Sequence, residues 1–298
     1  MFALIWDARE KKVHALNGSG AAPAAASIEE LRSQGHQRMP EFGAYSVSVP
    51  GTVHGWETLL AAHGTMTLSQ VLKPAIQYAD EGFPVTEVIA YQWHRVVDKL
   101  SRLPSGQEML IDGRAPKQGE LMTIPTLGNT LRAISEGGSQ AFYKGEIGEK
   151  IAAFVQEQGG WLANEDLASH CSDWDEPIST DYRGVTCWEC PPNGQGIAAL
   201  EALNVVEGFD MKAMGAQSAD RYHHLIEAMR LSLADAFRYV ADPRRVQVPM
   251  EQLTSKAYAE QRRGIIDSSQ AMASAPYGKV LDGSDTVYIS CVDGQGNA

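Results

Sequence analysis

Apolar and polar residues alternate near both ends of this chain, and helical periodicity occupies much of the sequence between them. Residues 2–7 and 12–16 have the alternation and the intervening turn of a β-hairpin, and Thr286–Val292 alternate in the same way. In the middle of the sequence, apolar residues recur at spacings of three or four, as on one face of an α-helix. Strands at both ends and helices between them predict an α+β fold or a layered sandwich of helices and sheets.

The clearest helical pattern covers residues 218–243. Ser218 is suited to an N-cap and Pro243 to a helix stop. The apolar positions of this helix are Tyr222, Ile226, Met229, Leu233 and Phe237. A second pattern, the alternating segment "GAYSVSVPG" at 43–51, predicts another strand.

Composition limits the classes of partner. Of the 298 residues, 44% are hydrophobic and 21% are charged, which is typical of a globular protein, and the net charge of -12 disfavours nucleic acid and anionic membranes as partners. The N-terminus lacks the basic start and apolar run of a secretory signal. We therefore expect a cytoplasmic location for the chain as written, and a periplasmic or extracellular one if a leader precedes it in nature.

The four cysteines are Cys171, Cys187, Cys190 and Cys291, too few for a disulfide scaffold in a chain of this length. Cys187 and Cys190 form a C-x-x-C pattern, which is found in redox dithiols and in half of some zinc sites. Here the pattern ends a strand-like segment, where residues three apart face opposite sides of a sheet. No second C-x-x-C and no pair of histidines follows at zinc spacing. We therefore favour the interpretation that Cys187 and Cys190 are strand residues without a shared role over a redox or zinc protein.

The segment "PPNGQG" at 191–196 precedes a helical pattern. Such a loop can hold an anion at the N-terminus of the helix behind it. The Gly-Lys-Ser/Thr ending of a P-loop is missing. A tight strand-to-helix turn is therefore favoured over a ligand loop.

Thr286 is the remaining candidate for chemistry. A threonine hydroxyl becomes a useful nucleophile when the threonine is at a chain terminus, because its own α-amine then acts as the base. An internal threonine gains that amine only if the preceding peptide bond is cut. The flexible "DGSD" approach and the firm strand start at Thr286 suit such a cut, although a threonine that opens a strand is common.

Several long segments together make the chain recognisable, and they cover nearly all of it. The chain resembles the γ-glutamyltransferase family (γ-glutamyltranspeptidase, glutathione hydrolase, cephalosporin-acylase-like) of N-terminal-nucleophile hydrolases. The matching segments are "FALIWDAREKKVHALNGSGAAPAAAS", "VPGTVHGWETLLAAHGTMTLSQVLKPAIQYADEGFPV", "FYKGEIGEKIAAFVQEQGGWLANEDLASH", "YRGVTCWECPPNGQGIAALEALN", "YHHLIEAMRLSLADAFRYVADP" and "DTVYISCVDGQGNA".

The resemblance implies a four-layer αββα sandwich and an inactive precursor that cuts itself between Asp285 and Thr286. Residues 1–285 would be the large-subunit region, and 286–298 the first strand and turn of the small subunit. Thr286 would then transfer a γ-glutamyl or related acyl group to water or an amine. The implied partners are a small-molecule γ-glutamyl or acyl-amide substrate and the small subunit of the same enzyme, with no metal and no organic cofactor.

Two departures from the family pattern matter. Family members that act on glutathione hold the substrate α-carboxylate with an arginine, and the corresponding positions here are Ser19 and, for related branches, Ala21. A clamp without a guanidinium lacks a bidentate charged contact, so an acyl amide without that carboxylate suits the chain better.

The resemblance also implies that family segments are missing at both ends. An N-terminal helix and strand would precede "FALIWD", and most of the small subunit would follow "DGQGNA". The alternative to an enzyme is therefore an incomplete, catalytically inactive fragment that needs a separate small-subunit chain. Exposed sheet edges in such a fragment predict aggregation or a partner requirement.

Overall fold

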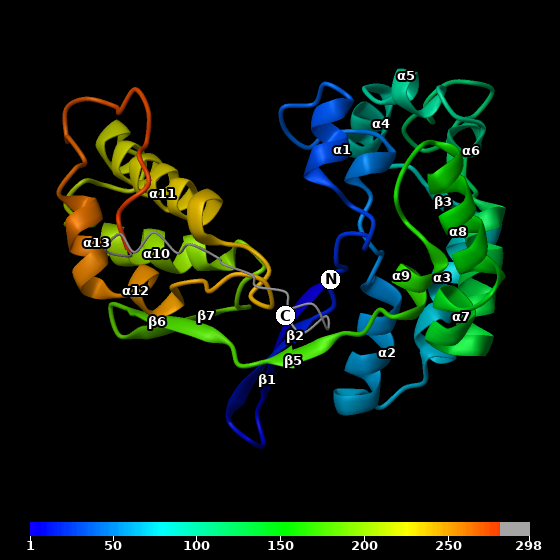
Figure 1. Ribbon diagram of the computed structural model, residues 1–298, viewed down its shortest axis with the longest axis horizontal. Coiled ribbons are helices and arrows are strands. Elements are labelled where there is room, and N and C mark those ends of the chain that lie inside the picture. Colours follow the sequence, from blue (N-terminus) through cyan, green and yellow to red (C-terminus); the bar gives the residue numbers. More distant parts are fainter. Residues whose placement is uncertain (281–298) are drawn as a thin grey trace, which may run out of the picture. The chain divides into compact units, whose positions relative to one another are not determined.

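The computed structural model describes residues 1–280, which form two compact units. Unit 1 contains Met1 and Leu16–Asp173, and unit 2 contains Phe2–Ala15 and the described residues from Trp174 onward. Each unit combines helices with short strands (Figure 1), which confirms the predicted α+β class. The predicted subunit boundary between residues 285 and 286 lies outside the described residues.

Unit 1 is mainly helical, and its two short strands pair antiparallel, Phe83 opposite Met122. Its elements are α1 (Ile28–Ser33), the 3-10 helix η1 (Ala44–Ser46), α2 (Thr52–His63), α3 (Leu68–Glu81), β3 (Phe83–Pro84), α4 (Glu87–His94), α5 (Val97–Leu100), α6 (Pro104–Gln107), β4 (Leu121–Met122), α7 (Pro125–Tyr143), α8 (Glu146–Glu157) and α9 (Asn164–Ala168). Leu131, Ile134 and Leu162 are among the buried residues of its core.

Helices α3 and α7 form the centre of unit 1. A capping box between Thr67 and Gln70 starts α3 by satisfying backbone N–H groups that lack a helical partner. A Cβ atom at Gly128 would lie 2.2 Å from Oδ1 of Asp80, so glycine at this position allows α7 to approach α3 closely. Arg132 of α7 also donates to Asp80, at 2.5 Å, which ties the two helices together.

Unit 2 combines helices with two small sheets. Its elements are β1 (Phe2–Asp7), β2 (Lys12–Asn17, whose last two residues belong to unit 1), β5 (Asp173–Asp175, whose first residue belongs to unit 1), β6 (Ile178–Tyr182), β7 (Val185–Glu189), α10 (Gly196–Glu207), α11 (Ala219–Tyr239), α12 (Met250–Leu253) and α13 (Lys256–Arg263). One sheet has the order β1-β2-β5, and the other is the antiparallel pair β6-β7. Helix α10 packs against this pair and against α11 (Figure 1). Among the described residues, no helix is long and apolar enough to span a membrane.

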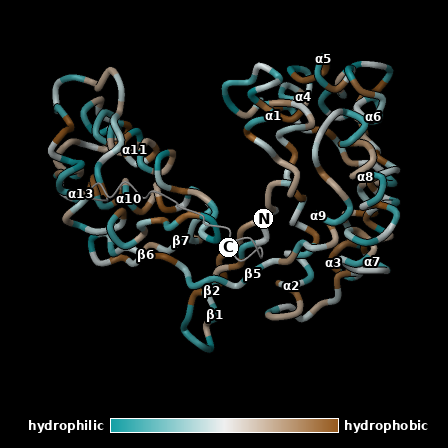
Figure 2. The backbone as a smooth tube through the Cα atoms, in the orientation of Figure 1, coloured by the Kyte–Doolittle hydropathy of each residue, from teal (hydrophilic) through white to brown (hydrophobic). Residues whose placement is uncertain are grey.

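The apolar stripe of α11 does not face the core. Apolar and polar positions intermingle along this helix (Figure 2), and Tyr222, Ile226 and Phe237 are 52%, 56% and 74% exposed. The buried positions of α11 are His224, Glu227, Ala228, Leu231, Ser232, Asp235 and Ala236. An amphipathic helix normally buries its apolar side, so α11 is inverted with respect to its own unit.

The predicted strand at 43–51 is wrong. Residues Ala44–Ser46 form a 3-10 turn, and no strand is assigned over this segment. The alternation itself has a cause, because Val47 and Val49 both pack against the core of unit 1. The segment is extended there without a parallel or antiparallel neighbour, so it makes no ladder of backbone hydrogen bonds.

Candidate functional site

The predicted nucleophile Thr286 and its neighbour Asp285 lie outside the described residues. The structure therefore places neither of them. What it does describe are the loop that carries Ser19 and Ala21 and the segment that ends at Val280, six residues before Thr286.

Ser19 and Ala21 lie on the loop that follows β2. The Ser19 hydroxyl donates to Oδ1 of Asn17 at 2.7 Å, and its backbone N–H donates to the same oxygen at 3.2 Å. The carbonyl of Ala21 accepts the N–H of Val49 at 3.0 Å. Hydrogen bonds to Asn17 and from Val49 thus define the loop, and neither the Ser19 nor the Ala21 side chain carries a charge for a substrate carboxylate.

A cluster of histidine, serine and tyrosine supports the base of this loop. A Cβ atom at Gly51 would lie 2.3 Å from the Gly18 carbonyl oxygen and 2.7 Å from the His170 ring, so the loop packs tightly here. Nδ1 of His54 lies 3.0 Å from Oγ of Ser172 and accepts the backbone N–H of Ser172 at 3.1 Å. That N–H places the proton of a neutral His54 ring on Nε2.

The cluster is partly dehydrated. Burial lowers the pKa of His170 and raises the pKa of Tyr143. The Tyr143 hydroxyl donates to the Pro50 carbonyl at 2.7 Å and accepts the N–H of His54 at 3.2 Å. The hydrogen bonds of Tyr143 and His54 join separate segments of unit 1 and fix the shape of the loop beside them. Its members come from distant parts of the sequence, so no local motif could have revealed them.

The "PPNGQG" segment forms a turn into α10, as the sequence favoured. Pro191 and Pro192 are buried. A Cβ atom at Gly196 would lie 2.6 Å from a carboxylate oxygen of Glu189, so an acidic side chain of this chain already lies beside the N-terminus of α10. A second anion would meet repulsion there.

The C-x-x-C pattern has the features of two structural cysteines. Cys187 lies within β7, and Cys190 follows the strand and is buried. Both thiols are free. Burial, together with the negative charges of Glu189 and Asp175, raises the pKa of Cys190, the reverse of what a redox thiol needs. No group of three or more potential metal ligands occurs within residues 1–280.

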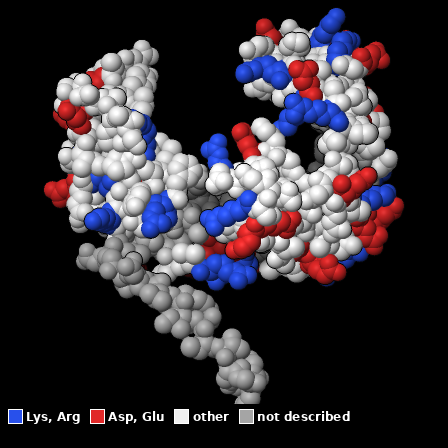
Figure 3. Space-filling model, turned by 45° about the horizontal axis from the view of Figure 1, so that its top comes forward, with Lys and Arg blue, Asp and Glu red and all other residues white. Residues whose placement is uncertain are grey.

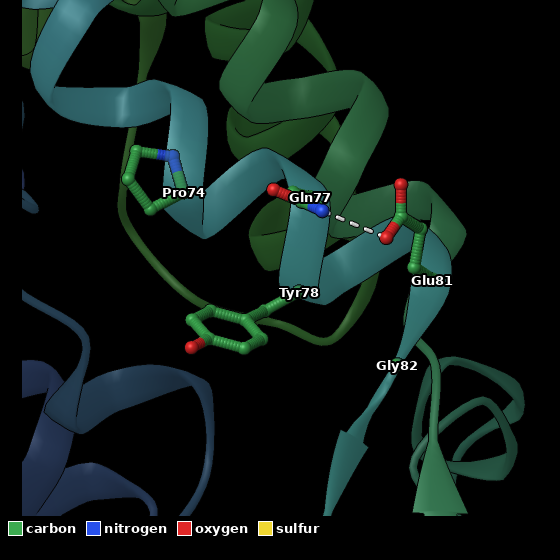
Figure 4. A pocket seen from close by; sticks show the side chains of 5 residues that line it. All are labelled: Pro74, Gln77, Tyr78, Glu81 and Gly82. Atoms are coloured by element: carbon green, nitrogen blue, oxygen red, sulfur yellow. Dashed lines mark hydrogen bonds between the residues drawn. The ribbon is translucent and has the colours of Figure 1, made fainter.

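A shallow pocket lies at the C-terminal end of α3 (Figure 4). Pro74, Gln77, Tyr78, Glu81 and Gly82 line it, and Gln77 donates to Glu81 across one turn at 2.8 Å. These residues provide no nucleophile with an adjacent base. On the face drawn in Figure 3, basic and acidic side chains are interspersed over unit 1.

The most unusual ionisable groups lie inside unit 2, in a buried cluster of Glu201, Asp235, Tyr258 and Arg262. Nε of Arg262 lies 2.8 Å from Oδ2 of Asp235, and these side chains are 5% and 0% exposed. Glu201 is 1% exposed, and its carboxyl group forms a hydrogen bond with that of Asp235. Burial and, secondarily, the contact with Asp235 raise the pKa of Glu201 to about 10. Burial likewise raises the pKa of Tyr258.

The raised pKa of Glu201 predicts a pH dependence of stability. In the unfolded chain this carboxyl group loses its proton near its ordinary value of 4.5, whereas the folded chain retains it to about 10. Folding then takes up a proton, so this group's contribution to stability falls as pH rises through that window. Glutamine cannot lose a proton, so the free energy of unfolding of Glu201→Gln lacks this pH dependence. Between pH 4.5 and about 10, we expect the difference in free energy of unfolding between Glu201→Gln and the wild type to shift in favour of the variant by about 1.4 kcal/mol per pH unit.

Urea unfolding at pH 6 and pH 8 measures this gain. Glu260→Gln, at an exposed position of α13, is the matched control and should follow the wild type at both pH values. Equal pH dependence for Glu201→Gln and the wild type would contradict a protonated Glu201.

Comparison with known proteins identifies the family. The gamma-glutamyltranspeptidase family model matches residues 1–298. The chain is 32% identical to the glutathione hydrolase-like YwrD proenzyme of Bacillus subtilis, over 100% of this chain and 56% of that protein. It spans about half the length of the curated relatives that it matches.

Two solved structures have a similar fold. Cephalosporin acylase from Bacillus halodurans is 40% identical with a TM-score of 0.84, and the match covers 94% of this chain and 52% of that one. The gamma-glutamyltranspeptidase of Helicobacter pylori is 30% identical with a TM-score of 0.86, covering 96% of this chain and 84% of that one. The sequence match over the whole chain and these two folds agree, and the chain belongs to the gamma-glutamyltranspeptidase family.

Proposed function

We propose that this chain contains the large-subunit region and the nucleophile of a self-cleaving acyltransferase or amide hydrolase, with residues 1–285 before the cut and 286–298 after it. One observation carries the proposal. The family match extends over all 298 residues, and it includes Thr286 at the start of the alternating segment "TVYISCV". Several of the matching relatives are named as proenzymes.

The proposed chemistry has two stages. In the precursor, Oγ of Thr286 attacks the carbonyl carbon of Asp285, and the C–N bond breaks as the nitrogen takes up a proton. Water then hydrolyses the resulting ester, which leaves a carboxylate on Asp285 and a free amine on Thr286. In the second stage that amine accepts the proton from Oγ, and Oγ attacks the carbonyl carbon of an amide substrate. The amide C–N bond breaks, the proton passes to the departing amine, and the acyl group remains on Oγ as an ester. Water or a second amine then attacks the ester carbonyl, and Oγ leaves and regains its proton.

The loop after β2 favours an acyl amide over a glutathione-like substrate. Ser19 and Ala21 provide no guanidinium, and the Ser19 hydroxyl already donates to Oδ1 of Asn17. A γ-glutamyl α-carboxylate would lose a bidentate, charge-assisted contact there. The similarity to an acylase from Pseudomonas and to cephalosporin acylase points the same way.

Expression of the full open reading frame that encodes this sequence tests the proposal. We expect intact-mass spectrometry to find two chains, the second of which begins at Thr286. Chromogenic amides with and without an α-carboxylate then separate the two substrate classes, and we expect faster release from the amide that lacks it. An intact single chain with full amidase activity would contradict the self-cleavage mechanism.

A second candidate is a fragment that needs a small-subunit polypeptide to complete it, and the exposed stripe of α11 favours such a partner. Within the described residues, Tyr222, Ile226, Met229 and Phe237 leave a row of large apolar side chains in solvent. Exposed apolar rows on a helix indicate an interface. The relatives are about twice as long as this chain, and we propose that their additional polypeptide is the type of partner that covers this row.

Substitution of the most exposed residue of this row tests the partner. We expect Phe237→Glu to weaken co-purification with the family's small-subunit polypeptide about tenfold or more, because burial of a phenylalanine contributes about 1.5–3 kcal/mol. Gln252→Glu makes the same change of charge at an exposed position of α12 and should bind like the wild type. Equal binding by both variants would place the interface elsewhere.

A further inference from the structure

The segment 272–280 has no regular secondary structure, yet side chains of two helices hold its backbone along its length. Isolated loop backbone groups are ordinarily satisfied by water or by neighbouring turns. Here the donors and acceptors come from α11 and α13, which places an irregular segment on a fixed path over unit 2.

The first contacts are made by a pair of charges on α11. The backbone N–H of Met272 donates to Oε2 of Glu227 at 3.0 Å. Nη1 of Arg230 donates to the carbonyl of Met272 at 2.7 Å and to Oε1 of Glu227 at 2.6 Å. The Glu227 side chain is only 2% exposed, so its hydrogen bond from Met272 is protected from water, whereas Arg230 is 34% exposed.

The later contacts involve the buried ion pair. The N–H of Gly278 donates to Oδ1 of Asp235 at 2.5 Å, and Nη2 of Arg262 donates to the Pro276 carbonyl at 2.5 Å. The Tyr239 hydroxyl donates to the Gly278 carbonyl at 2.6 Å and accepts the N–H of Val280 at 3.4 Å. The same groups that neutralise the interior of unit 2 thus hold the segment.

The fit at Gly278 is close. A Cβ atom there would lie 2.1 Å from the Tyr258 hydroxyl oxygen and 3.0 Å from Cδ of Arg262. Any larger residue would lift the backbone away from Asp235. The segment is therefore held by both hydrogen bonding and shape.

We propose that Glu227, Arg230, Asp235, Tyr239 and Arg262, the α11/α13 anchor, are positioning residues for self-cleavage. The inference rests on the proposed cut before Thr286. Residues 281–286 can span at most about 20 Å, so an anchored Val280 restricts where the scissile bond can go. Prior restriction of a reacting group lowers the entropy lost on reaching the reactive geometry.

Tyr239→Phe is the most conservative test, because it removes one oxygen and two hydrogen bonds. In the full open reading frame, we expect it to slow the appearance of the Thr286-terminated chain about fivefold. We expect Gly278→Ala to slow cleavage about tenfold or more without a change on α11. Tyr91→Phe, at an exposed position of α4, makes the same chemical change away from the segment and from the proposed interface, and this matched control should be cut at the wild-type rate.

A destabilised variant separates positioning from general support of the fold. Val205→Ala, in a buried apolar cluster of unit 2, lowers the melting temperature without touching the segment. We expect Val205→Ala to be cut at the wild-type rate, and Tyr239→Phe to show faster hydrogen exchange at Gly278 and Val280 together with slower cleavage.

The outcomes are distinguishable. If the wild type remains intact, the proposed function and this inference both fail. If the wild type is cut and Tyr239→Phe and Gly278→Ala are cut equally fast, only this inference fails. If Val205→Ala is slowed as much as Tyr239→Phe, the anchor supports the fold and does not position the junction.

Discussion

Substitution Thr286→Ala is expected to leave the precursor uncut and to reduce acyl transfer by at least about 10³-fold, because the same hydroxyl attacks in both stages. Thr286→Ser retains a hydroxyl and is expected to be cut and to remain active at a lower rate. Intact-mass spectrometry measures the cut, and release of a chromophore from an amide measures the transfer.

A nearby hydroxyl provides the control. Ser284→Ala alters the residue two positions before Thr286 and should be cut at close to the wild-type rate. A cut at the same bond in Thr286→Ala would contradict the proposed self-cleavage. Activity in Thr286→Ala with no cut would instead assign the chemistry to another residue.

Substitution Arg262→Met is expected to lower the free energy of unfolding by about 3–5 kcal/mol, because it leaves the Asp235 carboxylate buried without its counter-charge. The Asp235 side chain has no exposure to solvent, so water cannot replace the guanidinium. The same change removes the hydrogen bond to the Pro276 carbonyl. Urea unfolding followed by circular dichroism measures the loss.

Two further variants give this prediction its internal control. Arg245→Met, at an exposed position, should change the free energy of unfolding by less than about 0.5 kcal/mol. Asp235→Asn combined with Arg262→Met should recover part of the loss, because the unpaired charge is then gone. A loss below about 1 kcal/mol for Arg262→Met would mean that water reaches Asp235.

In α11, the spacing of apolar residues predicts the helix but not which side of it is buried. The spacing of Tyr222, Ile226 and Phe237 correctly predicts a helix, which the structure places at Ala219–Tyr239. The spacing does not reveal that these residues lie in solvent. The opposite side of α11 is buried because Asp235 pairs with Arg262 and accepts the backbone N–H of Gly278. Both partners lie more than 25 positions away in the sequence, so local spacing does not indicate them.

The segment 43–51 shows the reverse case. Alternation there predicts a strand, and Val47 and Val49 do point toward the core of unit 1. A strand also requires a neighbour for its backbone groups, and alternation does not report one. The hairpin at 2–16 has such a neighbour within a short turn, which is why its prediction is confirmed as β1 and β2.

By itself, the sequence determined the α+β class, the family and the candidate nucleophile, because those depend on residue order and on segments that can be compared locally. Thr286 remains a prediction that the described residues do not test. Only the tertiary structure decided the His54 cluster beneath the Ser19 loop, the protonated Glu201 and the anchoring of residues 272–280. These depend on burial and on pairs far apart in sequence, and the free energy of a buried charge is set by what folding places beside it.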